Sequence, residues 1–366
     1  MSHHPAHPHD TVRGASPLPR RPALAVAAVV LLVVGGLVVW RLGSTRTAFE
    51  EAVALAPQGT ERVAWTDWGA VRRELGVALD ADSSGEDVQA MLDDAFTQDL
   101  ASTSALNTSA VVLHEELGVS PATVQWELFA QSADGAVEVL ALTEDADPDA
   151  VRDRLAALGW DRPESEHGVW VGGADVLARV GPSLTPELQH VAVLSDERLL
   201  LTSDTTGYLA RAVDAIHGDG DRVTGLAGVT AALGEPVTAV VYTGPHACEK
   251  LAMAQADADA QAEADQLVEA AGGVHPLTAF AMGSLPGGEV RVALEVEDGA
   301  DAEAEAEARA QLAAGPAPGQ GGEFGDRFDV SGFASDGRVV TLDLRAGDGE
   351  YVLSDLSSGP VLFATC

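Results

Sequence analysis

The hydrophobic pattern of the chain begins with one long apolar run, Ala23–Trp40, which contains 18 residues and no charge. As a helix rising about 1.5 Å per residue, it would measure about 27 Å, close to the hydrocarbon thickness of a bilayer. The run therefore predicts a transmembrane helix over residues 23–42. Because neither a small-x-small cleavage signal nor a cysteine directly follows Trp40, an uncleaved anchor is favoured over a signal peptide or a lipoprotein.

The charges beside this run predict its orientation. Arg20 and Arg21 precede it, whereas Glu50 and Glu51 begin the acidic body that follows it. Basic residues are retained on the cytoplasmic side of a membrane, so the N-terminus is expected inside and the C-terminal body outside the cell membrane. The tail, residues 1–22, is rich in Pro and His and is predicted to be disordered.

Beyond a short helical stalk predicted over residues 43–56, a pattern of strand and helix signals occurs twice. "VAWTDW" and "VVYTGP" each end an alternating strand in an aromatic residue and threonine, with Trp65 aligned to Tyr242. A helix signal follows both, and Asp67 stands where a helix N-cap is favoured. This role explains Asp67 without catalysis.

The match continues further along the chain. Phe129-Ala130 corresponds to Phe280-Ala281, and each pair precedes a glycine-containing turn and a second alternating strand. An acidic helix then ends in Arg-x-x-Leu-Ala-Ala, at Arg152 and at Arg309. The order of strand, helix, two strands, helix and strand is that of the split βαβ, or ferredoxin-like, domain.

The sequence therefore predicts an α+β protein in which a transmembrane helix precedes two similar split-βαβ units with antiparallel sheets. The first unit is expected over residues 57–217, a linker helix over 218–233 and the second unit over 234–366. The pattern leaves open whether the two units share one sheet.

Two segments carry a resemblance to a known group of proteins. "HVAVLSDERLLLTSD" and "GLAGVTAALGEPVTAVVYT" resemble an uncharacterised family of bacterial single-pass membrane-anchored envelope proteins, a domain of unknown function. The resemblance implies an α+β envelope protein and supplies no catalytic residue. With one lysine, Lys250, among 21 basic residues, the composition is typical of a GC-rich bacterium.

Charge changes the picture of possible partners. From Arg41 onward the chain carries 18 basic and 56 acidic residues, a net of −38, because only three arginines and one aspartate come before it. Nucleic acid and anionic lipid headgroups repel a body of this charge. A nucleic-acid function is therefore excluded, and a solvated acidic surface is the favoured interpretation.

The chain has two cysteines, Cys248 and Cys366. Both lie on the predicted outer side of the membrane, where disulfides persist. A disulfide is favoured over two free thiols, and it would tie the C-terminal segment to the second unit. His246 lies only two residues from Cys248, and side chains at this spacing on a helix point apart, which disfavours a catalytic pair.

A search for catalytic or metal-binding patterns gives one partial match. "DADSSGEDVQAM" from Asp80 resembles the start of a calcium loop, but its twelfth position is Met91 instead of glutamate. A helix N-cap at Ser84 explains the stretch equally well. His114 and the other histidines outside the tail show no ligand spacing, so no catalytic residue, cofactor or metal ligand is assigned.

The sequence thus predicts a membrane-anchored envelope protein that works as a binding or interaction module on another envelope protein. The alternatives are a carrier or sensor of a small or lipid-like ligand between the two units, and an unrecognised envelope enzyme. A filled junction between the units would favour the first function, an apolar cavity the second, and convergent polar groups with shifted pKa values the third.

Overall fold

The computed structural model describes Met1 and residues 46–165 and 167–366. The predicted tail and the anchor Ala23–Trp40 therefore lie outside the described residues. Within the described part of the chain, no helix has both the length and the apolar character that crossing a membrane requires.

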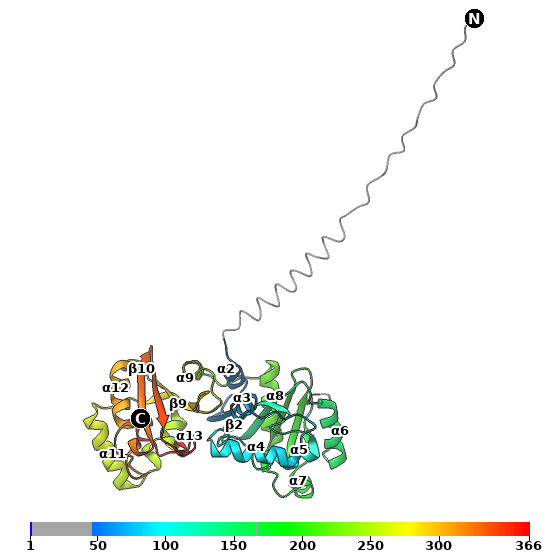
Figure 1. Cartoon of the computed structure of the whole chain (residues 1–366), viewed down its shortest axis with the longest axis horizontal. Coiled ribbons are helices and arrows are strands. Elements are labelled where there is room, and N and C mark those ends of the chain that lie inside the picture. Colours follow the sequence, from blue (N-terminus) through cyan, green and yellow to red (C-terminus); the bar gives the residue numbers. More distant parts are fainter. Residues whose placement is uncertain (2–45, 166) are drawn as a thin grey trace. The chain divides into compact units, whose positions relative to one another are not determined.

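The described body is built on one antiparallel sheet of eleven strands, in the order β10-β11-β9-β8-β7-β1-β2-β3-β6-β5-β4 (Figure 1). The α+β class is therefore confirmed. The strands are β1 (Arg62–Thr66), β2 (Val124–Ser132), β3 (Gly135–Leu142), β4 (Trp170–Val171), β5 (His190–Leu194), β6 (Leu199–Ser203), β7 (Thr238–Thr243), β8 (Leu277–Ser284), β9 (Glu289–Val296), β10 (Phe328–Asp336) and β11 (Val339–Ala346).

Each half of the sheet has the same strand order, β1-β2-β3-β6-β5 in the first and β7-β8-β9-β11-β10 in the second. The halves meet where β1 pairs antiparallel with β7, from Arg62 opposite Tyr242 to Thr66 opposite Thr238. The question of a shared sheet is thereby answered, because the backbone hydrogen bonds run from one half into the other.

The strand order differs from the expected ferredoxin-like arrangement. In a split βαβ unit the strands before and after the helix are parallel and leave room for a third strand between them. Here β1 pairs directly and antiparallel with β2, although α3 (Trp68–Leu75), α4 (Gly85–Thr97) and α5 (Ala110–Leu117) separate them. The split-βαβ prediction is wrong because a helix signal shows that the chain leaves the sheet, not where it returns.

The alignment of Trp65 with Tyr242 is also wrong by one residue. Ala64 pairs with Phe129, and Tyr242 pairs with Phe280. Ala64 therefore occupies the position that Tyr242 has in the second half. Because side chains alternate between the faces of a strand, the one-residue slip places Trp65 and Tyr242 on opposite faces of the sheet.

Helices cover both faces of the sheet and leave it as the middle layer (Figure 1). On one face, α3 to α7 cover the first half, and α11, α12 and the C-terminal segment cover the second half. On the other face, α8 packs over the first half, α9 packs over β8, β9 and β11 of the second half, and α2 packs against α9. The remaining helices are α2 (Ala48–Val53), α6 (Pro148–Leu158), α7 (Ala174–Val180), α8 (Thr206–His217), α9 (Ala227–Leu233), α10 (Gly244–His246), α11 (Ala258–Ala270), α12 (Ala302–Ala313) and α13 (Val352–Leu356).

The segment expected as a stalk contributes to the hydrophobic core. Helix α2 begins with a capping box between Thr47 and Glu50, as its sequence favours. Phe49 is 1% exposed, and its ring lies 5.6 Å from that of Trp65. The described part of residues 43–56 is therefore packed on the body, and α9 in the expected linker helix is packed in the same cluster.

Cys248 and Cys366 lie at disulfide distance and are joined, with their Cα atoms 5.7 Å apart and 118 residues between them in sequence. Cys248 belongs to a π-helical turn, Ala247–Leu251. The bridge fastens the end of the chain to the second half of the body.

Replacing both cysteines by alanine is expected to lower the free energy of unfolding. Loop closure over this separation gives an upper figure of about 4–5 kcal/mol, because the unfolded chain gains entropy when the link is removed. Urea unfolding of the wild type and of Cys248→Ala/Cys366→Ala would measure the difference. A reductant should destabilise the wild type alone, and equal midpoints for both proteins would contradict the expectation.

Candidate functional site

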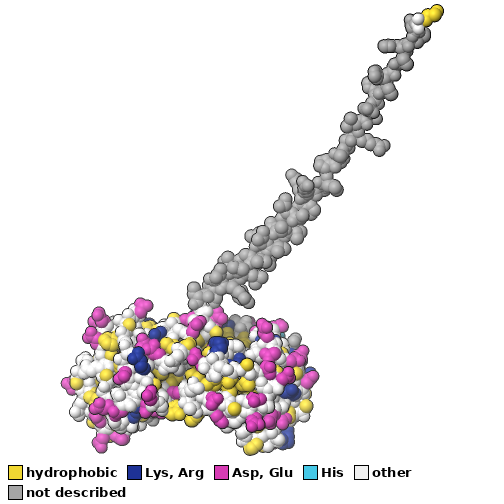
Figure 2. Space-filling view, in the orientation of Figure 1, with side chains coloured by type: hydrophobic (Ala, Val, Ile, Leu, Met, Phe, Trp, Pro, Cys, Tyr) yellow, Lys and Arg dark blue, Asp and Glu magenta, His cyan; other side chains and the backbone are white. Residues whose placement is uncertain are grey.

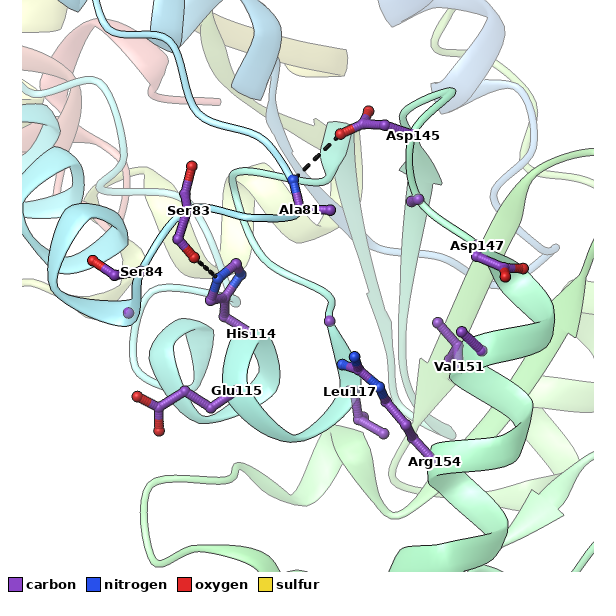
Figure 3. A pocket seen from close by; sticks show the side chains of 14 residues that line it. Ala81, Ser83, Ser84, His114, Glu115, Leu117, Asp145, Asp147, Val151 and Arg154 are labelled. Carbon is purple, nitrogen blue, oxygen red and sulfur yellow. Dashed lines mark hydrogen bonds between the residues drawn. The ribbon is translucent and has the colours of Figure 1, made fainter.

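A pocket of about 450 Å³ opens on the surface between the start of α4, the end of α5 and the start of α6. Its wall carries hydroxyl, carboxylate, imidazole and guanidinium groups beside apolar side chains (Figure 3). It is the candidate functional site because this volume lies in the range of small-molecule pockets.

The stretch that resembled a calcium loop forms one edge of this pocket. Ser84 is the N-cap of α4, and its hydroxyl and the Asp87 carboxylate form a capping box. Met91, at the twelfth loop position, is 2% exposed in the core and so does not face the loop. The helix-cap interpretation is therefore confirmed, and these contacts account for the stretch without calcium.

His114 connects two sides of the pocket (Figure 3). Its Nε2 lies 2.6 Å from the carbonyl oxygen of Ser83, and its Nδ1 lies 3.0 Å from the hydroxyl of Ser120. Since a carbonyl only accepts, Nε2 carries the hydrogen in the neutral ring and Nδ1 accepts from Ser120. The imidazole is buried and both nitrogens are engaged, so His114 positions the loop before α4.

Charged groups of both signs complete the wall. Arg154 is exposed on α6 and forms no ion pair within the described part of the chain. Asp145 accepts a hydrogen bond from the Ala81 backbone N–H at 3.3 Å, and a hydrogen bond from Thr143 lowers the pKa of the Asp145 carboxyl. The pocket can therefore hold a small polar molecule, with a cation and carboxylates available at its rim.

The hydroxyl groups of this pocket are poorly placed for nucleophilic catalysis. The Ser84 hydroxyl donates to Asp87 at 2.6 Å. Hydrogen bonds from the Ser84 hydroxyl and the Ser84 backbone N–H lower the pKa of the Asp87 carboxyl. This carboxylate is therefore a weak base. The geometry at Ser84 therefore serves the start of α4.

A second polar cluster is buried against the middle of the first half of the sheet, and sequence reasoning missed it. Glu127 on β2 and Glu138 on β3 are 1% and 2% exposed. Four donors surround the Glu127 carboxylate: the Trp68 indole at 3.0 Å, the Ser104 hydroxyl at 2.7 Å, and the backbone N–H groups of Ala105 and Leu106 at 2.6 and 3.3 Å.

Glu138 is much less well satisfied than Glu127. Thr202 donates to its Oε2 at 3.3 Å, and its Oε1 has no hydrogen-bond partner among the protein atoms. Burial raises the pKa of both carboxyls, and the charge of Glu127 raises the pKa of Glu138 further. The four donors lower the pKa of Glu127 and partly offset its burial, so Glu138 is the carboxyl of the pair with the higher pKa.

The second half of the body shows that the fold does not require this pair. Phe129 pairs with Glu138, whereas its counterpart Phe280 pairs with Leu294. An apolar side chain thus fills the position of Glu138 in the same strand order. The only sequence signal is the two acids within the alternating strands of "WELFAQSADGAVEV", a pattern in which an acid is usually exposed.

The structure brings together only one of the sequence-assigned pairs, Cys248 with Cys366. The anchor residues Ala23 and Trp40 lie outside the described residues. Within residues 46–165 and 167–366, no three His, Cys, Asp or Glu side chains come together as a metal site would require.

Comparisons with known proteins add little. No protein-family model and no curated protein matches the chain. Solved structures that are similar include crystal forms I and III of TP0453, with TM-scores of 0.39 and 0.40, identities of 7% and 8%, and coverage of 83% of this chain and 96% of that one. Crystal form IV of TP0453 gives a TM-score of 0.40 at 8% identity over 85% of this chain and 100% of that one. Similarity at this level transfers no function to this chain.

Proposed function

We propose that this protein is a single-pass membrane protein of a bacterial envelope whose acidic outer body is an interaction module for another envelope protein. The apolar run Ala23–Trp40 and the charges around it support the anchor and its orientation, with the N-terminus in the cytoplasm. The strand order repeated on both sides of the β1–β7 junction supports an origin by internal duplication.

The observation that carries the proposal is the filled junction between the two halves. One hydrophobic cluster extends across it, with Leu128 and Val139 from the first half and Ala239, Ala281 and Ala293 from the second. These side chains are at most 1% exposed. A ligand carried between the halves would need a space that packed side chains occupy, so the outer surface is the favoured place for function.

The surface is suited to a basic partner. The body from Arg41 onward has a net charge of −38, and Figure 2 shows acidic side chains over both sides of the face in view. Complementary charge speeds association and weakens with salt. The Glu127–Glu138 pair does not favour an enzyme, because both carboxyl groups are closed off from solvent.

Purification of the full chain from membranes tests this function. We expect a stoichiometric protein partner whose retention falls at least about tenfold when salt rises from about 50 to about 500 mM. Recovery of the chain with a bound small molecule and no partner, by native mass spectrometry, would contradict the interaction module.

A second candidate is binding of a small polar ligand in the pocket of Figure 3, favoured by the unpaired Arg154 at its rim. In the same native mass spectra, this candidate predicts an added mass that Arg154→Glu removes. Arg179→Glu, a charge reversal of an arginine that does not line this pocket, is the matched control and should keep the added mass.

A further inference from the structure

We propose that a surface pocket between α2 and α9 binds the headgroup end of an anionic phospholipid of the membrane in which the chain is anchored. The inference rests on the proposed anchor, which would hold this pocket near the membrane although the net charge of the acidic body repels anionic headgroups, and it adds a specific lipid contact. The pocket measures about 460 Å³ and lies beside Arg46, the first residue of the described body.

The wall of this pocket is mainly apolar. Val53 from α2 and Leu226 before α9 are buried and form part of the lining, and Val223 and Ala231 line it nearer the surface. The hydroxyl of Thr230 donates to the Leu226 carbonyl at 3.1 Å and is thereby satisfied within the helix. The pocket therefore offers apolar contacts to glycerol and the first methylene groups of an acyl chain.

The charged groups at the rim favour a phosphate. The Glu50 carboxylate accepts the Thr47 backbone N–H at 2.9 Å as part of the capping box, so it has a structural partner. Arg46 is exposed and forms no ion pair with another residue of the described body. A guanidinium can bind two phosphate oxygens at once, which a phospholipid headgroup supplies.

The length of chain before Arg46 limits where the pocket can be. Five residues, 41–45, separate Arg46 from Trp40, the predicted outer end of the anchor. Fully extended, this connection spans about 20 Å. If Trp40 lies at the outer interface, the guanidinium of Arg46 is within reach of the headgroup layer.

The pocket of Figure 3 provides an internal contrast. Three carboxylates, those of Glu115, Asp145 and Asp147, contribute to its wall, against that of Glu50 in the pocket between α2 and α9, so it repels a phosphate more strongly. Of these two pockets, the one between α2 and α9 combines an apolar lining, an unpaired arginine at its rim and a short connection to the anchor.

Photocrosslinking of the full chain in nanodiscs tests the inference. The nanodiscs contain phosphatidylglycerol, part of it with a diazirine near the glycerol end of an acyl chain, and crosslinked peptides are located by mass spectrometry. We expect crosslinks within residues 46–54 and 223–231. Ala231→Trp, which fills the pocket from an exposed helix position, and Arg46→Glu should each lower their yield about tenfold.

Ala150→Trp is the matched control, because Ala150 lines the pocket of Figure 3, and it should leave the yield unchanged. Nanodiscs in which phosphatidylcholine replaces phosphatidylglycerol and carries the diazirine should give the low yield with the wild type as well. Equal crosslinking of the wild type and Ala231→Trp, with both folded by circular dichroism, would overturn the lipid site. Release of the wild type from membranes by alkaline carbonate would overturn the anchor and with it the proposed function, whereas retention without these crosslinks would overturn the lipid site alone.

Discussion

Replacing Arg309 by alanine is expected to lower the free energy of unfolding by about 3–5 kcal/mol, since the change removes one partner of a buried ion pair. Arg309 on α12 is fully buried, and its Nε donates to the Glu305 carboxylate at 2.9 Å. Burial lowers the pKa of the Arg309 guanidinium, but an arginine remains charged at neutral pH. Without Arg309, Glu305 would keep a buried negative charge that only His275 contacts.

Arg309 also holds two backbone segments. Its guanidinium donates to the carbonyl oxygens of Phe363 at 2.8 Å, Thr365 at 3.0 Å and His275 at 2.7 Å. Two of these acceptors precede Cys366, so the arginine and the disulfide fasten the same C-terminal segment. The losses of unfolding free energy from removing Arg309 and from removing the disulfide should therefore not add, because residues in one network are coupled.

Arg152→Ala is the matched control. Arg152 has the same place in the repeated Arg-x-x-Leu-Ala-Ala sequence, on α6. Its side chain is 15% exposed, it pairs with the solvent-exposed Asp149, and it donates to one backbone carbonyl, that of Val193 at 2.9 Å. We expect a loss of about 1–2 kcal/mol for Arg152→Ala. Urea unfolding measures both variants, and equal losses would contradict the structural role assigned to Arg309.

The features that sequence reasoning identified correctly depend on local chemistry. Asp67 and Ser84 accept backbone N–H groups at the starts of α3 and α4, as N-cap residues do wherever a helix begins. The cysteine pair was predictable because a chain with two cysteines permits only one intramolecular bridge. These inferences needed no knowledge of which strands are neighbours.

The features that sequence reasoning missed depend on strand register and strand order. Trp65 and Tyr242 point to opposite faces of the sheet, so aligning them shifted the two strands by one residue. In a short motif, two aromatic residues look equivalent whichever face they occupy. The burial of Glu138 could not be predicted, because an acid in an alternating strand is usually exposed. Its burial follows from the helices packed over that face, which strand periodicity does not reveal.

Raising the pH is expected to destabilise the wild type relative to Glu138→Gln. A carboxyl whose pKa is raised on folding stabilises the folded state below its unfolded pKa, and this contribution is lost as the pH rises through the folded pKa. Burial and the neighbouring charge of Glu127 raise the pKa of Glu138 well above its ordinary value of 4.5. Glutamine does not titrate and has nearly the shape of a protonated glutamate, so it fills the same space without a proton to lose.

The advantage of Glu138→Gln should therefore grow by about 1.4 kcal/mol for each pH unit between the unfolded and the folded pKa of Glu138. The groups around Glu138 are common to both proteins: Glu127 on β2, Glu187 on the 3₁₀ turn Pro186–Leu188, and the uncharged Thr202 on β6. The difference in stability therefore reports the pKa of Glu138 as these neighbours set it. Urea unfolding at several pH values from about 5 to about 9 measures the difference.

Glu127→Gln separates this proton-holding role from a general need for polar groups at the site. Its amide nitrogen would face donors on Trp68, Ser104 and two backbone N–H groups, so we expect a loss of about 2–4 kcal/mol already at pH 5. A difference between the wild type and Glu138→Gln that stays constant with pH would show that Glu138 does not hold the shared proton.

Glu138→Leu adds a further condition, because Leu294 fills the corresponding position without a polar partner. Leucine does not titrate either, so Glu138→Leu should show the same dependence on pH relative to the wild type as Glu138→Gln.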